Sequence, residues 1–142
     1  MRLLLAVLPL VLVACDASSD ETGPSDSDAD TDTDADITYD DDIQPIWDTL
    51  CGAGCHMGGT TSGNLDLSPG QSYADIVNVA SKQADGLDRV EPGDPLASYL
   101  WRKLDGSHVK VGGSGDRMPV GGALDAADVA TVETWINAGA AP

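Results

Sequence analysis

The chain has 142 residues, and its 24 acidic and 7 basic side chains give a formal net charge of −17. Because Lys and Arg form no cluster, the chain has no basic surface of the kind that binds nucleic acid. The length fits one small domain beside terminal segments.

Residues 1–14 have the layout of a signal peptide. Arg2 precedes the apolar run LLLAVLPLVLV, which is too short to span a bilayer, since a membrane helix needs about 20 residues. The run ends in LVAC, which resembles the lipobox of bacterial lipoproteins. The resemblance implies cleavage before Cys15 and a diacylglycerol on its sulfur; the alternative is an ordinary secretory signal with a chance cysteine. In both cases we expect export into an oxidising compartment.

The segment 15–36 starts at Cys15 and continues with acidic and small residues, without a base or an aromatic ring. Such a composition cannot bury enough apolar surface to offset chain entropy, so we expect a disordered, self-repelling tether. The alternating aspartates do not complete a calcium-binding EF-hand loop. Counted from Asp28, the sixth residue is Thr33 instead of Gly, and the twelfth is Tyr39 instead of Glu.

Residues 37–142 are expected to form one small all-α domain of three to four helices with long Gly-rich loops. The first helix is predicted over 40–51, because it starts with acidic residues and its apolar residues share one face: Ile43, Ile46, Trp47 and Leu50. A weaker helical pattern lies around 73–77. The stretch 111–122 is the most prominent Gly-rich loop, and a loop of this length in a small domain usually serves a site.

Two later segments carry clearer helix signals, over 94–105 and 125–138. The residues that start or end them are Asp94, Pro95 and Gly106 for the first, and Asp125 and Gly139 for the second. The predicted buried faces consist of Leu96, Tyr99, Leu100 and Leu104 in the first, and of Val129, Val132 and Ile136 in the second.

The stretch TLCGAGCHMGG places Cys51 and Cys55 four residues apart, with His56 directly after them. A C-x-x-C-H signature indicates covalent haem attachment, in which two thiols bond to the haem vinyl groups and the histidine ligates iron. Here the spacing is one residue longer. Residues four apart on a helical turn still point to one side, and the spacers Gly-Ala-Gly are small, so the variant is sterically feasible.

Three other uses of these residues stay open. A Cys51–Cys55 disulfide would suit an oxidising compartment, but it leaves His56 unexplained. A zinc site would combine the two thiols with His56 and His108, although neighbouring residues seldom reach one tetrahedral ion together. A catalytic thiol would need an activating group, and His56 is the one candidate in view.

Haem also demands a second axial ligand, presented by a loop far downstream. Met118 meets this demand: it precedes Pro119 in the Gly-flanked stretch GDRMPVGG and lies 62 residues after His56. His108 is the competitor for this position, and ligation by two histidines would lower the reduction potential. Candidates to pair with the haem propionates are Arg102, Lys103 and Arg117.

The order of IQPIWDTLCGAGCH, RMP and DVATVETWINAG is similar to that in class I cytochromes c, and more narrowly to the cytochrome c-like domains of exported bacterial lipoproteins. The resemblance covers about residues 40–139. It implies one covalent haem c per chain, with Cys51 and Cys55 as thioether anchors, His56 as the proximal and Met118 as the distal ligand. It also implies that the helix with Tyr99, Leu100 and Trp101 lines the haem pocket.

A haem iron with both axial positions filled transfers single electrons and does no bond chemistry on a substrate. We therefore expect a monomeric electron carrier, not an enzyme, anchored by its lipid in the bacterial cell envelope and facing the periplasm or the cell surface. Its partners would be redox proteins of the envelope. The alternatives are a non-haem interaction module with a disulfide or metal site, and a peroxidase or sensor in which Met118 dissociates.

Overall fold

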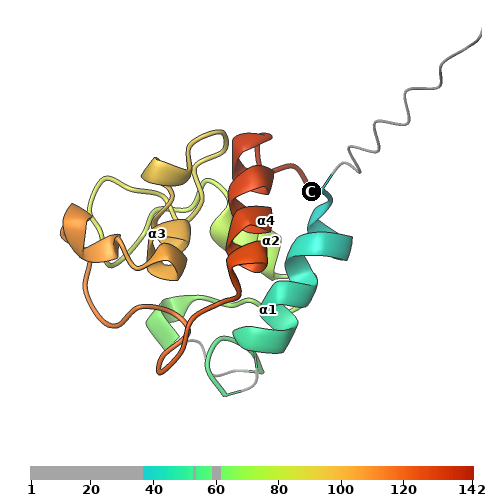
Figure 1. Cartoon of the computed structure of the whole chain (residues 1–142), viewed down its shortest axis with the longest axis horizontal. Helices are drawn as coiled ribbons and strands as arrows, with labels where there is room; N and C mark the ends of the chain where they lie inside the picture. Colours follow the sequence, from blue (N-terminus) through green and yellow to red (C-terminus); the bar gives the residue numbers. More distant parts are fainter. Residues whose placement is uncertain (1–36, 53, 59–61) are drawn as a thin grey trace, which may run out of the picture. The chain divides into compact units, whose positions relative to one another are not determined.

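The computed structural model describes residues 37–52, 54–58 and 62–142 (Figure 1). The predicted signal peptide, the lipidation of Cys15 and the acidic tether lie outside these residues. The described part is helical, which confirms the all-α class. Its α-helices are α1 (Gln44–Leu50), α2 (Ser72–Ile76), α3 (Tyr99–Asp105) and α4 (Ala126–Asn137). No helix among the described residues has the length and apolar character needed to cross a membrane.

Shorter helical turns accompany these helices: η1 (Tyr39–Ile43), η2 (Ser62–Asn64), η3 (Pro95–Ala97) and η4 (His108–Val111). The described residues contain no β-strand, only isolated bridges such as the one between Val77 and Val90. The bridges hold the extended segment after α2 beside the segment that leads into η3. Long loops join the elements, as the Gly-rich composition predicted.

The helix predicted over 40–51 is present as η1 followed by α1. Three of its four predicted core residues are buried: Ile43, Ile46 and Trp47. Leu50 is 40% exposed, so its assignment to the core was wrong. The reason is positional, since α1 ends at Leu50 and this side chain borders a cavity instead of packing between helices.

The helix predicted over 94–105 is divided in two. Asp94 caps η3 by accepting a hydrogen bond from the amide of Ala97 (3.0 Å), but Ser98 is extended (φ −91°, ψ 107°) and separates η3 from α3. Because η3 is out of register with α3, Leu96 lies off the apolar stripe and is 60% exposed, against the prediction. The rest of the stripe is buried, and Gly106 ends α3 in the left-handed region (φ 87°) as predicted.

Helix α4 closely matches its prediction. The carboxylate of Asp125 accepts a hydrogen bond from the amide of Ala127 (3.0 Å) and caps the helix. Val132 and Ile136 are fully buried and Val129 is partly buried against the core. The helix ends at Asn137, two residues before Gly139 at φ 101°.

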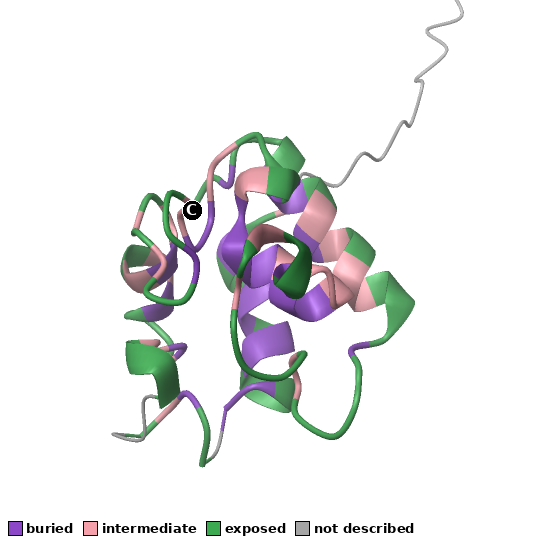
Figure 2. Ribbon diagram, turned by 90° about the vertical axis from the view of Figure 1, so that its left-hand side faces the viewer, coloured by how far each residue is buried: buried purple, intermediate pink, exposed green. Residues whose placement is uncertain are grey.

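The core lies where α4 packs against η1 and α3, and its largest fully buried side chains are Trp47 and Trp135. Figure 2 shows the buried residues in purple, gathered on the helices at the centre of the ribbon. The ring of Tyr39 packs against that of Trp135 at a tilt of 50°, with 5.3 Å between the ring centroids, and meets the ring of Tyr73 edge-on at 5.1 Å. The indole N–H of Trp135 donates to the carbonyl of Ala141 (2.7 Å), which ties the C-terminal segment to this cluster. These contacts hold η1, α2 and α4 together, and α1, which follows η1 directly, leads into the site.

Candidate functional site

A cavity of about 350 Å³ opens beside the C-terminal end of α1, and its volume lies in the range of small-molecule and cofactor sites. It brings together Cys51, Cys55, His56 and Met118, although Met118 comes from a distant loop. The other lining residues are Trp47, Leu50, Ser62, Gly63, Leu65, Leu67, Ser81, Lys82, Gln83, Arg89, Tyr99, Leu100, Lys103, Leu104, Pro119 and Val120. The wall is therefore mostly apolar, with a few polar groups.

The two cysteines reach the cavity through a turn, not through a continued helix. Cys51 is the C-cap of α1, and its amide donates to the carbonyl of Trp47 (2.9 Å). The amides of Cys55 and His56 both donate to the carbonyl of Gly52 (3.1 and 3.2 Å), which closes the turn. Gly54 adopts φ 86°, a conformation that favours glycine, so the longer spacing is accommodated locally.

Gly52 also has a steric reason to be glycine. A Cβ placed there would lie 2.9 Å from the sulfur of Met57 and 3.0 Å from the carbonyl oxygen of Asp48. The sulfur could move aside, but the carbonyl belongs to the backbone of α1. The absence of a side chain at Gly52 thus allows the turn to lie close to α1.

Both thiols are free in the structure, with Cys51 buried and Cys55 exposed. Burial raises the pKa of the Cys51 thiol to about 11, and the neighbouring Cys55 adds to this effect. Cys51 is consequently a neutral thiol at pH 7. This state is unfavourable for a catalytic thiolate, which needs a lowered pKa.

His56 lies at the cavity wall and is only 9% exposed. Its backbone is fixed, since its carbonyl accepts a hydrogen bond from the amide of Leu67 (2.8 Å). The ring Nδ1 is buried without a hydrogen-bond partner among the described residues. The buried Nδ1 of His108 is unpaired in the same way, so it is the position of His56 at the cavity wall that makes its ring a candidate ligand for a group bound there.

His108 does not line the cavity. It is buried in η4, and its Nε2 is hydrogen-bonded to the carbonyl of Gly115 (2.9 Å). The described residues also contain no group of three or more His, Cys, Asp and Glu side chains that could hold a metal ion. The geometry thus favours Met118 over His108 as the partner of His56, and it gives the zinc arrangement no support.

The polar part of the wall is cationic. Lys82, Arg89 and Lys103 line the cavity, whereas no Asp or Glu is among its described lining residues. The protein as a whole is acidic, yet its cavity is lined by basic and not by acidic side chains. The cavity therefore has a local positive field that would attract an anionic group. A mostly apolar cavity lined by three cations fits a hydrophobic molecule that carries anionic groups.

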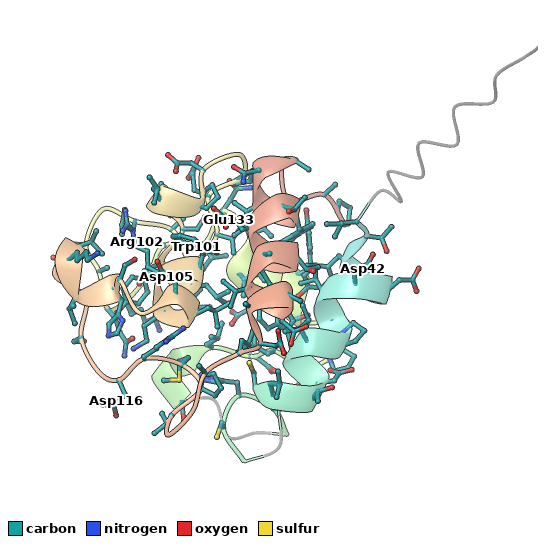
Figure 3. All side chains as sticks on the ribbon, viewed as in Figure 1. Asp42, Trp101, Arg102, Asp105, Asp116 and Glu133 are labelled. Atoms are coloured by element: carbon teal, nitrogen blue, oxygen red, sulfur yellow. The ribbon has the colours of Figure 1, made fainter. Side chains whose placement is uncertain are left out.

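Of these three cations, only Lys103 was predicted from the sequence. Arg102 donates from Nε to the carbonyl of Leu96 (2.6 Å) and lies away from the cavity (Figure 3), and Arg117 donates to the carbonyl of Leu104 (2.8 Å). Both are therefore poorly placed to meet a group bound in the cavity. Lys103 is correctly placed, although its ammonium already donates to two backbone carbonyls.

Arg89 is the functional candidate that the sequence analysis missed. It is 7% exposed, forms an ion pair with Asp75 (2.7 Å) and donates to the carbonyls of Asp75 and Asn64 (both 2.6 Å). It follows α2 in a segment without a motif, so no local signal marks it. The guanidinium has five N–H groups, and these contacts leave part of its donor set for a ligand.

The loop before Met118 depends on a glycine. A Cβ at Gly113 would lie 2.6 Å from the hydroxyl of Tyr99 and 2.8 Å from the carbonyl oxygen of His108. We expect Gly113→Ala to lower the free energy of unfolding by about 1–3 kcal/mol through overpacking, as measured by urea denaturation. Gly122→Ala is the matched control, since a Cβ there meets nothing within 4 Å; equal effects of the two changes would contradict the prediction.

Comparisons with known protein families, with curated proteins and with solved structures found no match. The chemistry of the cavity therefore has to be inferred from its own wall. That wall includes two thiols, an imidazole, a thioether and three cations.

Proposed function

We propose that the protein is a lipid-anchored electron carrier of the bacterial cell envelope that holds one covalent haem c. The observation that carries this proposal is the convergence of Cys51, Cys55, His56 and Met118 on one apolar cavity. In the sequence, these residues belong to two segments separated by 62 positions. Their meeting at one cavity is what covalent haem attachment with histidine and methionine ligation requires.

The residues present fit this group in three respects. The two thiols are free and lie on the same cavity, which suits thioether bonds to the haem edge. The His56 ring has an unsatisfied nitrogen at the wall, which suits an iron ligand. The cations, with Arg89 held by Asp75, suit the two propionates.

Haem supplies one-electron redox chemistry when it is bound. The chain's own part is to bind, orient and shield it. His56 and Met118 would both hold the iron and so leave no place on it for substrate or oxygen, while Trp47, Leu67 and Leu100 would keep water from the bound group. A sulfur ligand opposite histidine raises the reduction potential relative to two histidines.

The lipid on Cys15 and the acidic segment 16–36 complete the proposal. A lipid anchor would hold the carrier at the membrane, and a tether of about 20 residues would let the domain move between a donor and an acceptor. Such confinement raises the effective concentration of the partners without a permanent complex.

The test of this function is the mass and colour of the mature protein, made in a bacterium that attaches haem to exported proteins. We expect a band that keeps its haem stain on a denaturing gel, and a mass that exceeds the amino acids plus lipid by one haem. A colourless protein whose mass equals the polypeptide plus lipid would overturn the proposal. If that protein also lacked two thiol protons, the disulfide-bonded interaction module would replace it.

A further inference from the structure

The loop that carries Met118 is fixed to α3 by an unusual concentration of hydrogen bonds to one lysine. The ammonium of Lys103 donates to the carbonyl of Ser114 (3.0 Å) and to that of Asp116 (2.5 Å). The carbonyl of Lys103 accepts a hydrogen bond from the amide of Met118 (3.0 Å). Lys103 therefore contacts the loop at three points within five residues, through both its side chain and its backbone.

Lys103 is also buried to a degree that is rare for lysine. It is only 7% exposed, and burial lowers the pKa of its ammonium while the Asp116 carboxylate partly offsets this effect. Holding a charge in such a place is unfavourable unless the charge is hydrogen-bonded. The loop carbonyls supply that compensation, so the loop and the ammonium stabilise each other.

Neighbouring contacts support the same segment. The hydroxyl of Tyr99 donates to the carbonyl of Ser114 (3.2 Å), and Nε of Arg117 donates to the carbonyl of Leu104 (2.8 Å). Asp116 itself projects outward at the edge of the molecule (Figure 3), so its carbonyl, not its carboxylate, is what Lys103 binds. No other described residue outside the loop makes as many hydrogen bonds to the Met118 loop as Lys103 does.

We propose that Lys103 is the residue that positions Met118, and that its ammonium keeps the loop closed against the cavity. The proposal rests on the proposed function only in giving Met118 the role of an iron ligand. Lysine suits this task because its compact ammonium offers three donors at the end of a flexible stem, which two converging carbonyls and a third group can share. A positioning role also explains why Lys103 lines the cavity although its donors point mainly at the loop.

The test compares Lys103→Leu with Lys110→Leu in the full-length protein as purified. Lys110 is exposed in η4, so the control removes the same charge without touching the loop. The first readout is amide hydrogen exchange over residues 114–118. Since a hydrogen bond to a charged group is typically worth a factor of roughly ten or more, we expect exchange of the Met118 amide to accelerate at least about tenfold in Lys103→Leu and to stay unchanged in Lys110→Leu.

The second readout concerns the iron. We expect the reduced Lys103→Leu protein to bind carbon monoxide and to have a lower reduction potential, because a loosened Met118 frees an axial position. The wild type and Lys110→Leu should do neither. Unchanged exchange and unchanged carbon monoxide binding in Lys103→Leu would overturn the positioning role.

The two proposals can fail separately. If the protein carried no haem, the function would be wrong, yet hydrogen exchange would still report whether Lys103 holds the loop. If Lys103→Leu did not fold, Lys103→Gln would serve instead, because its amide keeps one donor for one carbonyl. We then expect acceleration at the Met118 amide with the unfolding midpoint little changed, and no acceleration would overturn the proposal.

Discussion

Replacing Cys51 and Cys55 together by serine is expected to remove all covalently bound haem. Both thioether bonds would be lost, and a cavity of about 350 Å³ between α1, α3 and the Met118 loop would lose its apolar filling. Each single change should leave one bond, and therefore a weaker haem stain on a denaturing gel. The measurement is the ratio of haem absorption to protein in the purified material.

Cys15→Ser is the matched control for this experiment. It makes the same sulfur-to-oxygen change at the one other cysteine of the chain. We expect it to release the protein from the membrane while leaving haem attachment intact. The three cysteines would thus divide into one anchor and two attachment sites. Haem staining that survives the double replacement, or is lost on Cys15→Ser alone, would contradict this division.

Replacing Arg89 by leucine is expected to lower the free energy of unfolding by about 3 kcal/mol, because it leaves buried partners without their donor. Arg89 is 7% exposed and donates to the backbone carbonyls of Asn64 and Asp75. The Asp75 side chain is 34% exposed, so water can recover part of the lost ion pair. Urea denaturation of the protein as purified measures the change.

Arg102→Leu provides the comparison, since it removes the same charge from a partly exposed side chain outside the cavity. We expect it to cost no more than about 1 kcal/mol, as its main contact is one hydrogen bond to the carbonyl of Leu96. Similar losses for the two arginines would show that Arg89 has no special role in holding the cavity wall.

The helices were predictable where their signals are local. Asp125 starts α4 and Gly106 ends α3 because a cap or a left-handed residue acts on its own neighbours. Leu96 was misplaced because the extended Ser98 interrupts the segment. Ser98 is fully buried, and its hydroxyl donates to the carbonyl of Asp94 (2.8 Å) while accepting from the amide of Glu91 (2.9 Å), contacts that periodicity does not reveal.

The residues of the candidate site also fall into two groups, those that the local sequence predicts and those that it does not. The cysteine-histidine motif Cys51–His56 is contiguous, so its spacing and its small residues could be evaluated directly from the sequence. Met118 was proposed from a demand for a distant partner, and its position at the cavity agrees with that expectation. Arg89 and Lys82 could not be anticipated, because each faces the cavity only through the path of the chain after α2.

By itself, the sequence determined the all-α class and the helix caps. It also determined a cysteine-histidine motif whose small spacer residues tolerate one residue more than C-x-x-C-H. Each of these features depends on residues close together in the chain. Only the tertiary structure decided that Met118 and not His108 faces that motif, and which cations face the cavity. The physical reason is that a wall assembled from distant segments depends on packing, and on the hydrogen bonds by which Lys103 and Arg89 hold the loops around it.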